Sequence, residues 1–258
     1  MRPELNVVTL VSIGRHPGSG RERRAEQDGR ALELGLRLAG RRVTALHAGD
    51  PEAGALRHYA GMGLPGLRVL KQGQESDALP VLADYLSQHP TDIVLTGVRA
   101  EAGESSGMLP YLLGETLGWP VVPRIADITR VEGGYAEILQ ALPRGQRRAL
   151  RVKLPFVASV DMAATAPRQS AYGPASRALI ESQAVATQVD SERAGWRTAP
   201  ARKRPKRLKV VKAKSAAERF KAATAKAQKE GGLVIKDQPA AEQARAIFDL
   251  LLEEGVVR

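Results

Sequence analysis

Short apolar runs alternate with amphipathic stretches through the first 120 residues. Continuous apolar runs with the length of buried strands occupy residues 5–13, 43–48, 67–70 and 93–96. Between them, apolar residues recur at helical spacing over residues 31–39, from Pro51 to Gly61, and over residues 77–88. This alternation predicts a mainly parallel, doubly wound α/β sheet with helices on both faces.

The fourth run leads into the most informative stretch of the chain. A polar, glycine-bearing loop from Arg99 to Gly107 follows it, and a helical pattern then extends from Met108 to Leu117. Such a loop lies beyond the carboxyl end of a parallel strand, where doubly wound sheets bind ligands. Free N–H groups at the helix start, with Ser105 or Ser106 as the cap, would form an anion site. An ordinary turn whose serine caps the helix is the alternative interpretation.

The pattern changes after residue 120. Residues 125–131 and 135–142 flank two glycines and predict an antiparallel hairpin, and residues 147–152 and 155–161 predict further strands. After Ala163 the periodicity is lost, apart from a short helical patch near residues 175–180.

Two parts of the chain differ in composition. Residues 1–190 predict a nucleotide-binding-like α/β core, whereas residues 191–258 predict a basic linker and an extended C-terminal arm. Within the arm, residues 215–231 suggest one helix and residues 239–255 a terminal helix. The apolar stripe of the terminal helix consists of Ala244, Ile247, Phe248, Leu251 and Leu252. We expect this stripe to pack on a partner subunit.

Several chemistries are excluded or disfavoured. The chain has no cysteine, which excludes disulfides, thiolate metal sites and a cysteine nucleophile, and its four histidines lack metal-site spacing. After the first run the chain reads GRHPGSG, which departs from the GxGxxG fingerprint, so we expect residues 14–20 and the charged run 21–24 to be solvated loops. No apolar segment approaches ~20 residues and the N-terminus is unlike a signal peptide, so a cytoplasmic protein is expected.

The net charge of +11 suggests a polyanionic partner. Much of this charge lies in residues 197–214, which makes a nucleic-acid-binding protein one alternative. Because aromatic residues form only 4% of the chain and no known nucleic-acid motif is present, a charged linker is the favoured interpretation.

The order of several motifs resembles the β subunit of electron transfer flavoproteins. These motifs are AEQDGRALELGLRL, DIVLTGVRAEAGESSGMLPYLLGETLGWP, VEGGY, LPFVASVD and the APR of residues 166–168. The resemblance implies a heterodimer whose α subunit holds most of the FAD contacts. It further implies electron transfer from a flavin dehydrogenase to a membrane quinone oxidoreductase. The flavin performs the redox chemistry, so the resemblance implies an electron carrier subunit rather than an enzyme.

The resemblance also implies where cofactors and partners bind. A β subunit usually buries an AMP, or in some branches a second FAD. The residues expected to line such a nucleotide are Val11, Ser12, Ala48, Gly49, Gly97, Gly103, Ser105, Ser106 and Gly107. In the family's recognition loop, Tyr172 takes the position of a docking leucine, and Arg168 lies just before it. Both are therefore expected to contact a partner dehydrogenase.

One further alternative uses the same sheet differently. A nucleotide-binding α/β protein, either an adenine-nucleotide hydrolase relative or a sensor, would need a phosphate loop directly after the first strand. The segment GRHPGSG offers glycines and a serine for that purpose.

Overall fold

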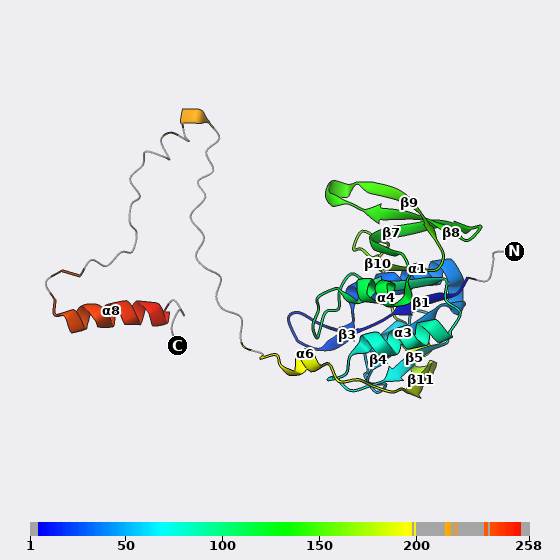
Figure 1. Ribbon diagram of the computed structural model, residues 1–258, viewed down its shortest axis with the longest axis horizontal. Coiled ribbons are helices and arrows are strands. Elements are labelled where there is room, and N and C mark those ends of the chain that lie inside the picture. Colours follow the sequence, from blue (N-terminus) through cyan, green and yellow to red (C-terminus); the bar gives the residue numbers. More distant parts are fainter. Residues whose placement is uncertain are drawn as a thin grey trace. The chain divides into compact units, whose positions relative to one another are not determined.

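The structure is a computed structural model that describes residues 5–197, 199, 215–217, 220, 235–236 and 238–253 (Figure 1). Two units can be distinguished, residues 1–196 and residues 197–258. The first unit is an α/β domain built on one large sheet. No helix in the described part of the chain combines the length and the apolarity needed to cross a bilayer.

The large sheet confirms the expected fold class. Its spatial order is β11-β5-β4-β1-β6-β10-β7-β8-β9, in which the strands from β11 to β7 are parallel and β8 and β9 are antiparallel. The strands are β1 (Val7–Leu10), β4 (Thr44–Gly49), β5 (Gly66–Lys71), β6 (Ile93–Gly97), β7 (Val121–Glu132), β8 (Tyr135–Ala141), β9 (Arg147–Lys153), β10 (Phe156–Val160) and β11 (Leu179–Ala184).

Helices cover both faces of this sheet, which explains the continuous apolar runs. The helices are α1 (Glu26–Ala39), α2 (Leu56–Ala60), α3 (Ala78–Gln88), α4 (Leu109–Leu117), α5 (Tyr172–Arg177) and α6 (Ser191–Ala194), with single 3₁₀ turns η1 (Gly40–Arg42) and η2 (Pro143–Gly145). Neighbouring strand residues enter different cores: Val7 packs with the residues of α1 and α2, whereas Val8 packs with those of α3 and α4. Every residue of β1, β6 and β10 is therefore buried.

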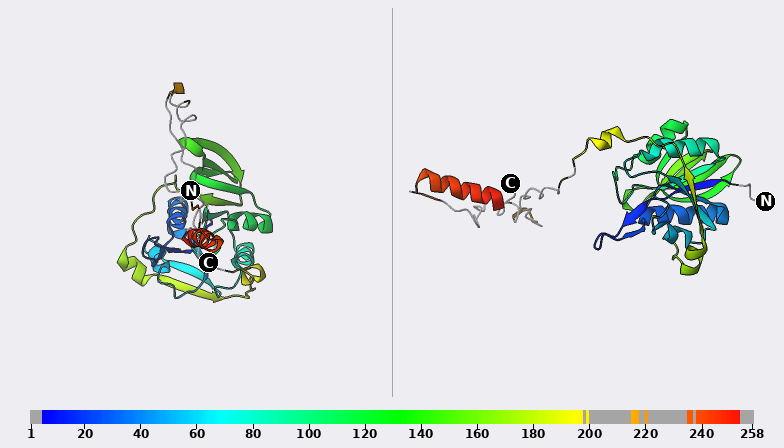
Figure 2. Two further views of the ribbon diagram at one scale, coloured as in Figure 1. Left: turned by 90° about the vertical axis from the view of Figure 1, so that its left-hand side faces the viewer. Right: turned by 90° about the horizontal axis from the view of Figure 1, so that it is seen from below.

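The chain leaves the sheet earlier than its apolar pattern suggests. The first strand ends at Leu10, and β2 (Ile13–Arg15) pairs with β3 (Glu22–Arg24) as an antiparallel hairpin. Residues 16–21 form an exposed turn, as expected, whereas the expectation of loops was wrong for residues 14–15 and 22–24, which lie in these two strands. Contacts distant in sequence hold this hairpin, because Arg23 pairs with Glu101 and the Arg24 guanidinium donates to the Arg168 carbonyl. In the right-hand view of Figure 2 the hairpin, dark blue, projects away from the sheet.

Three other expectations also need correction. Helix α2 begins at Leu56 rather than at Pro51, and α5 begins at Tyr172 rather than near residue 175. Strand β11 was missed, because a lone edge strand whose residues are mostly exposed has no hydrophobic alternation. Its pairing with β5 requires Gly66, where a Cβ atom would lie 2.7 Å from the Leu179 carbonyl oxygen.

The antiparallel end of the sheet agrees with its prediction. Gly133 and Gly134 join β7 to β8 with φ of 58° and 78°, the left-handed conformation that a tight type I′ hairpin requires. Strand β9 then continues the ladder, with Tyr135 opposite Lys153 and Ala141 opposite Arg147.

The second unit contains α8 (Ala240–Glu253), which matches the expected terminal helix. None of its residues is buried, and its exposed large apolar side chains are Ile247, Phe248, Leu250 and Leu252. Gly255, the basic cluster from Arg202 to Lys214 and most of the helix expected over 215–231 lie outside the described residues.

Candidate functional site

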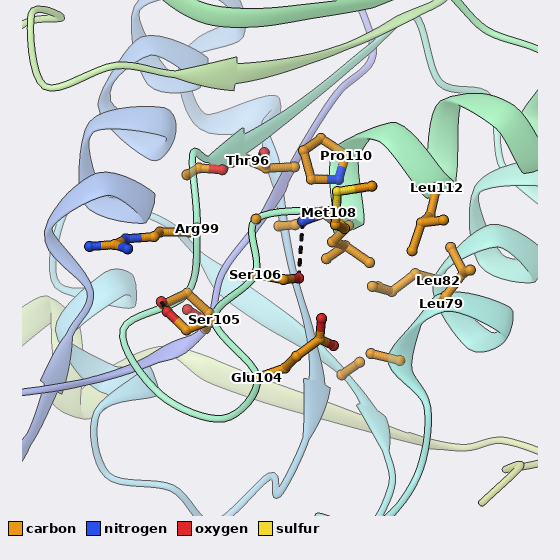
Figure 3. Close-up of a pocket in the computed structure, with 18 of the residues that line it drawn as sticks. Leu79, Leu82, Thr96, Arg99, Glu104, Ser105, Ser106, Met108, Pro110 and Leu112 are labelled. Carbon is orange, nitrogen blue, oxygen red and sulfur yellow. Dashed lines mark hydrogen bonds between the residues drawn. The ribbon is translucent and has the colours of Figure 1, made fainter. Parts of the chain in front are cut away.

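A cavity of about 290 Å³ opens at the carboxyl ends of the central parallel strands (Figure 3). From β1 the chain continues to β4 on one side, whereas β6 lies on the other side of β1, so the strand order reverses here. Ligands of doubly wound sheets bind at such a reversal. One wall is apolar and comes from α3 and α4, through Leu79, Leu82, Met108 and Leu112, whereas the opposite wall is the polar loop that follows β6.

Most of the nucleotide-site residues expected from the sequence meet at this cavity. Seven of the nine line it, namely Val11, Ser12, Ala48, Gly97, Ser105, Ser106 and Gly107. Gly49 and Gly103 are not among the residues that line it. Ala48 and Gly97 lie in strands β4 and β6, and the other five follow β1 or β6, which agrees with a site assembled at the ends of the strands.

A buried carboxylate that lines the cavity joins the ends of β1 and β6. Asp28 Oδ2 accepts hydrogen bonds from Ser12 N at 2.8 Å and from Ser12 Oγ at 2.5 Å, and Asp28 Oδ1 accepts one from Gly97 N at 3.0 Å. Burial raises the pKa of Asp28 to about 6, although the bonds from Ser12 and Gly97 oppose the shift. Asp28 therefore fixes the two strand ends relative to one another.

The first turn of α1 also fastens the base of the cavity loop. Gln27 Oε1 accepts from Val98 N at 2.9 Å and from Arg99 N at 3.2 Å. Glu101, from the loop after β6, also contacts this part of the chain. Its Oε1 accepts a hydrogen bond from Glu26 N at 2.8 Å, and its carboxylate forms an ion pair with Arg23 at 3.1 Å. The backbone donors of residues 97–99 are consequently committed to protein acceptors and do not face a ligand.

The start of α4 differs from its prediction. Its N-cap is Met108, without a side-chain cap, so the expectation that Ser105 or Ser106 caps the helix was wrong. Met108 N donates to Ser106 Oγ instead, Pro110 has no N–H group, and Tyr111 N donates to the Met108 carbonyl. The helix terminus therefore offers few free donors to an anion.

The loop itself supplies the donors that the helix start lacks. In the described part of the chain, no backbone N–H group of residues 102–107 donates to a protein acceptor. Gly103, Ser105 and Gly107 have φ of 75°, 56° and 77°, whereas the intervening residues do not have positive φ. Such alternation is typical of anion-binding nests, in which successive N–H groups point toward one concavity.

A segment from the C-terminal side of the domain crosses near the same cavity. Asp77 N donates to the Gln188 carbonyl at 2.9 Å, and Asp190 N donates to the Glu75 carbonyl at 3.0 Å. Asp190 and Arg193 line the cavity together with Asp77, Arg99 and Glu104. The sequence analysis missed these residues because their positions depend on tertiary pairing, which has no local signal.

The segment GRHPGSG forms the turn of the β2–β3 hairpin and does not line the cavity. His16 Nδ1 lies 3.2 Å from Gly18 N and 3.1 Å from Ser19 N and accepts from both, which uses these donors within the turn. The geometry thus gives no support to a phosphate loop after β1.

The two expected docking residues differ in their surroundings. Tyr172 is 88% exposed at the start of α5. Arg168, in contrast, binds Glu33 of α1 through Nε at 2.7 Å and through its second terminal nitrogen at 2.8 Å, and these hydrogen bonds lower the pKa of Glu33. The Arg168 guanidinium is therefore already bound within the chain.

Comparison with known proteins gives the family. Residues 22–188 match the electron transfer flavoprotein domain family. Over 261 aligned residues the chain is 53% identical to the electron transfer flavoprotein subunit beta of Chromohalobacter salexigens, covering 100% of the chain and 98% of the relative. It is 31% identical over 143 residues to the putative electron transfer flavoprotein subunit YgcR of Escherichia coli, covering 52% of the chain and 54% of that relative. The chain belongs to the electron transfer flavoprotein family as a β subunit, an electron carrier that pairs with an α subunit.

Proposed function

We propose that this β subunit, with its α subunit, accepts electrons from a flavin dehydrogenase and passes them to a membrane quinone oxidoreductase. In this proposal the electrons are carried on an FAD that the α subunit mainly holds. The cavity of the β subunit binds an adenine nucleotide, either AMP or a second FAD. The observation that carries this assignment is the strand-end cavity with its loop of unpaired N–H groups, because such a loop suits a phosphate.

Ligands released from the purified heterodimer test the assignment. Denaturation followed by mass spectrometry should yield one FAD from the α subunit and one AMP per heterodimer. Release of a second FAD in place of AMP would show that the cavity of the β subunit binds FAD. A heterodimer that releases FAD but no second nucleotide, even after incubation with AMP, would contradict the nucleotide site.

A methyl group on the loop should disturb this site. Gly107 has φ of 77°, and a Cβ atom there would lie 2.8 Å from the Val98 carbonyl oxygen, so Gly107→Ala must shift the loop. We expect at least tenfold lower retention of the nucleotide, measured by chromatography of the denatured heterodimer.

Gly133→Ala is the matched control for the loop variant. Gly133 also has a positive φ, of 58°, but no atom lies within 4 Å of the position that its added methyl group would take, and it belongs to a distant hairpin. Both variants carry a left-handed alanine, which costs about 1–2 kcal/mol. Equal retention in the two variants would show that the loop does not hold the ligand.

We further infer that Tyr172 docks the partner dehydrogenase. Its ring is 88% exposed, and an exposed aromatic anchor contributes strongly to protein interfaces. Tyr172→Ala should raise the KM for the heterodimer in dehydrogenase-driven flavin reduction by about thirtyfold, which corresponds to about 2 kcal/mol. FAD content should not change.

Tyr135→Ala, which truncates another surface tyrosine, is the control and should leave the KM unaltered. An unaltered KM for Tyr172→Ala would show that Tyr172 does not dock the dehydrogenase.

A further inference from the structure

The lining of the cavity is acidic rather than basic. Four carboxylates line it, Asp28, Asp77, Glu104 and Asp190, against two guanidinium groups, Arg99 and Arg193. The Arg193 guanidinium donates to the Gln74 carbonyl, and in Figure 3 Arg99 points away from the Glu104 carboxylate. His47 adds no charge near neutral pH, because burial lowers its pKa. Positively charged side chains therefore contribute little to the surface that a ligand in this cavity would contact.

Three of the four carboxylates are occupied by protein donors. Asp28 accepts from Ser12 and Gly97, Asp77 Oδ1 accepts from Leu79 N at 2.9 Å, and Asp190 Oδ1 accepts from Arg193 N at 3.0 Å.

Glu104 differs from these three carboxylates. Within the described residues its side chain forms no hydrogen bond and no ion pair, and Figure 3 shows its carboxylate pointing toward the space between Ser106 and Leu79. Its backbone belongs to the loop of residues 102–107, whose N–H groups have no protein acceptor among the described residues. The unpaired carboxylate of Glu104 therefore lies in the same loop that we propose binds a phosphate group.

We propose that Glu104 restricts the cavity to ligands with a single phosphate group, so that it accepts nucleoside monophosphates and rejects diphosphates and triphosphates. This specificity rests on the nucleotide site proposed above, and of the two ligands named there it selects AMP, because FAD carries two linked phosphate groups. The nest donors compensate the first phosphate directly. A second phosphate that extends from the loop into the space between Ser106 and Leu79 would meet the Glu104 carboxylate, and like charges repel each other. A volume of about 290 Å³, near the lower end for ligand sites, also favours a small ligand.

A competition between nucleotides tests this role of Glu104. The FAD-saturated heterodimer, freed of its nucleotide by mild denaturant, is refolded with equimolar AMP, ADP and ATP in EDTA, and the retained nucleotides are quantified by mass spectrometry. The wild type should retain mainly AMP. Glu104→Gln preserves the shape and removes the charge, so the retained ratio of ADP to AMP should rise about tenfold. The side chain is exposed and unpaired, so folding should be unaffected.

Glu75→Gln serves as the matched control, since Glu75 is an exposed glutamate in the loop before α3 that does not line the cavity, and its ratio should equal that of the wild type. An unchanged ratio in Glu104→Gln, with AMP still bound, would overturn the specificity and leave the nucleotide site intact. An equal loss of all three nucleotides would also overturn it, because Glu104 would then hold a group common to them, such as the ribose hydroxyls. Failure of the wild type to retain any nucleotide would remove the site itself.

Discussion

The contribution of Asp28, a buried carboxylate, to the free energy of unfolding should fall by about 3 kcal/mol as the pH rises from below about 4 to above about 6. In the folded chain the pKa of Asp28 is raised to about 6, above all by burial, against 3.8 for an unperturbed aspartate. Between these two values the folded chain keeps a proton that the unfolded chain has released, so rising pH favours unfolding. Below about pH 4 the contribution is fully present, and above about pH 6 it is lost.

Asp28→Asn isolates this contribution. The amide carries no charge and can still accept from Gly97 N, so the variant should lack the loss between pH 4 and 6 although it loses bonds to Ser12 at every pH. Urea unfolding of both proteins at intervals from pH 4 to 8 gives the difference curve. Glu33, whose pKa is lowered by its bonds to Arg168, produces the opposite slope in both proteins and cancels in the difference. Parallel curves for the two proteins would refute the assignment to Asp28.

The parts of the fold that were predictable are those with a local physical cause. Strands β1, β6 and β10 are buried on both faces, so their apolar runs are continuous and readable. The glycine pair at 133–134 marks its hairpin because both residues need left-handed backbone. By contrast, β11 and the β2–β3 hairpin owe their existence to distant partners such as Gly66 and Glu101, and no nearby pattern encodes these.

The candidate site shows the same division. Its position beyond β6 follows from the rule that parallel strands present ligands at their carboxyl ends, and most of the expected residues lie there. The local sequence does not show which backbone N–H groups remain free for a ligand, those of the loop after β6 or those at the start of α4. Pro110 removes one donor from α4, and Gln27 takes two from the loop, so the free N–H groups lie in the loop rather than at the helix. Asp28 reads as an ordinary acidic residue in the first turn of a helix, and its role requires knowing that Ser12 and Gly97 are adjacent.

The terminal helix α8 carries an apolar surface without a partner in its own unit, as far as that unit is described. Phe248 is 50% exposed and Ile247 is 61% exposed, although both lie on one side of a 14-residue helix. An isolated helix of this length is marginal in water, and its stability normally comes from packing an amphipathic face. Since this chain is one subunit of a heterodimer, we infer that the face formed by Ile247, Phe248 and Leu251 packs on the α subunit.

Placing charges on this face should separate the two subunits. Phe248→Glu combined with Leu251→Glu removes two large apolar contacts, each contributing about 1.5–3 kcal/mol when fully buried, and would place two carboxylates in the interface. We expect the dissociation constant of the heterodimer to rise at least a hundredfold, measured by analytical ultracentrifugation with FAD absorbance as the signal. Ala246→Glu introduces the same group on the opposite side of α8 and should leave assembly intact. If the double variant binds the α subunit as tightly as Ala246→Glu does, α8 does not pack there, because no buried apolar face tolerates two unpaired carboxylates.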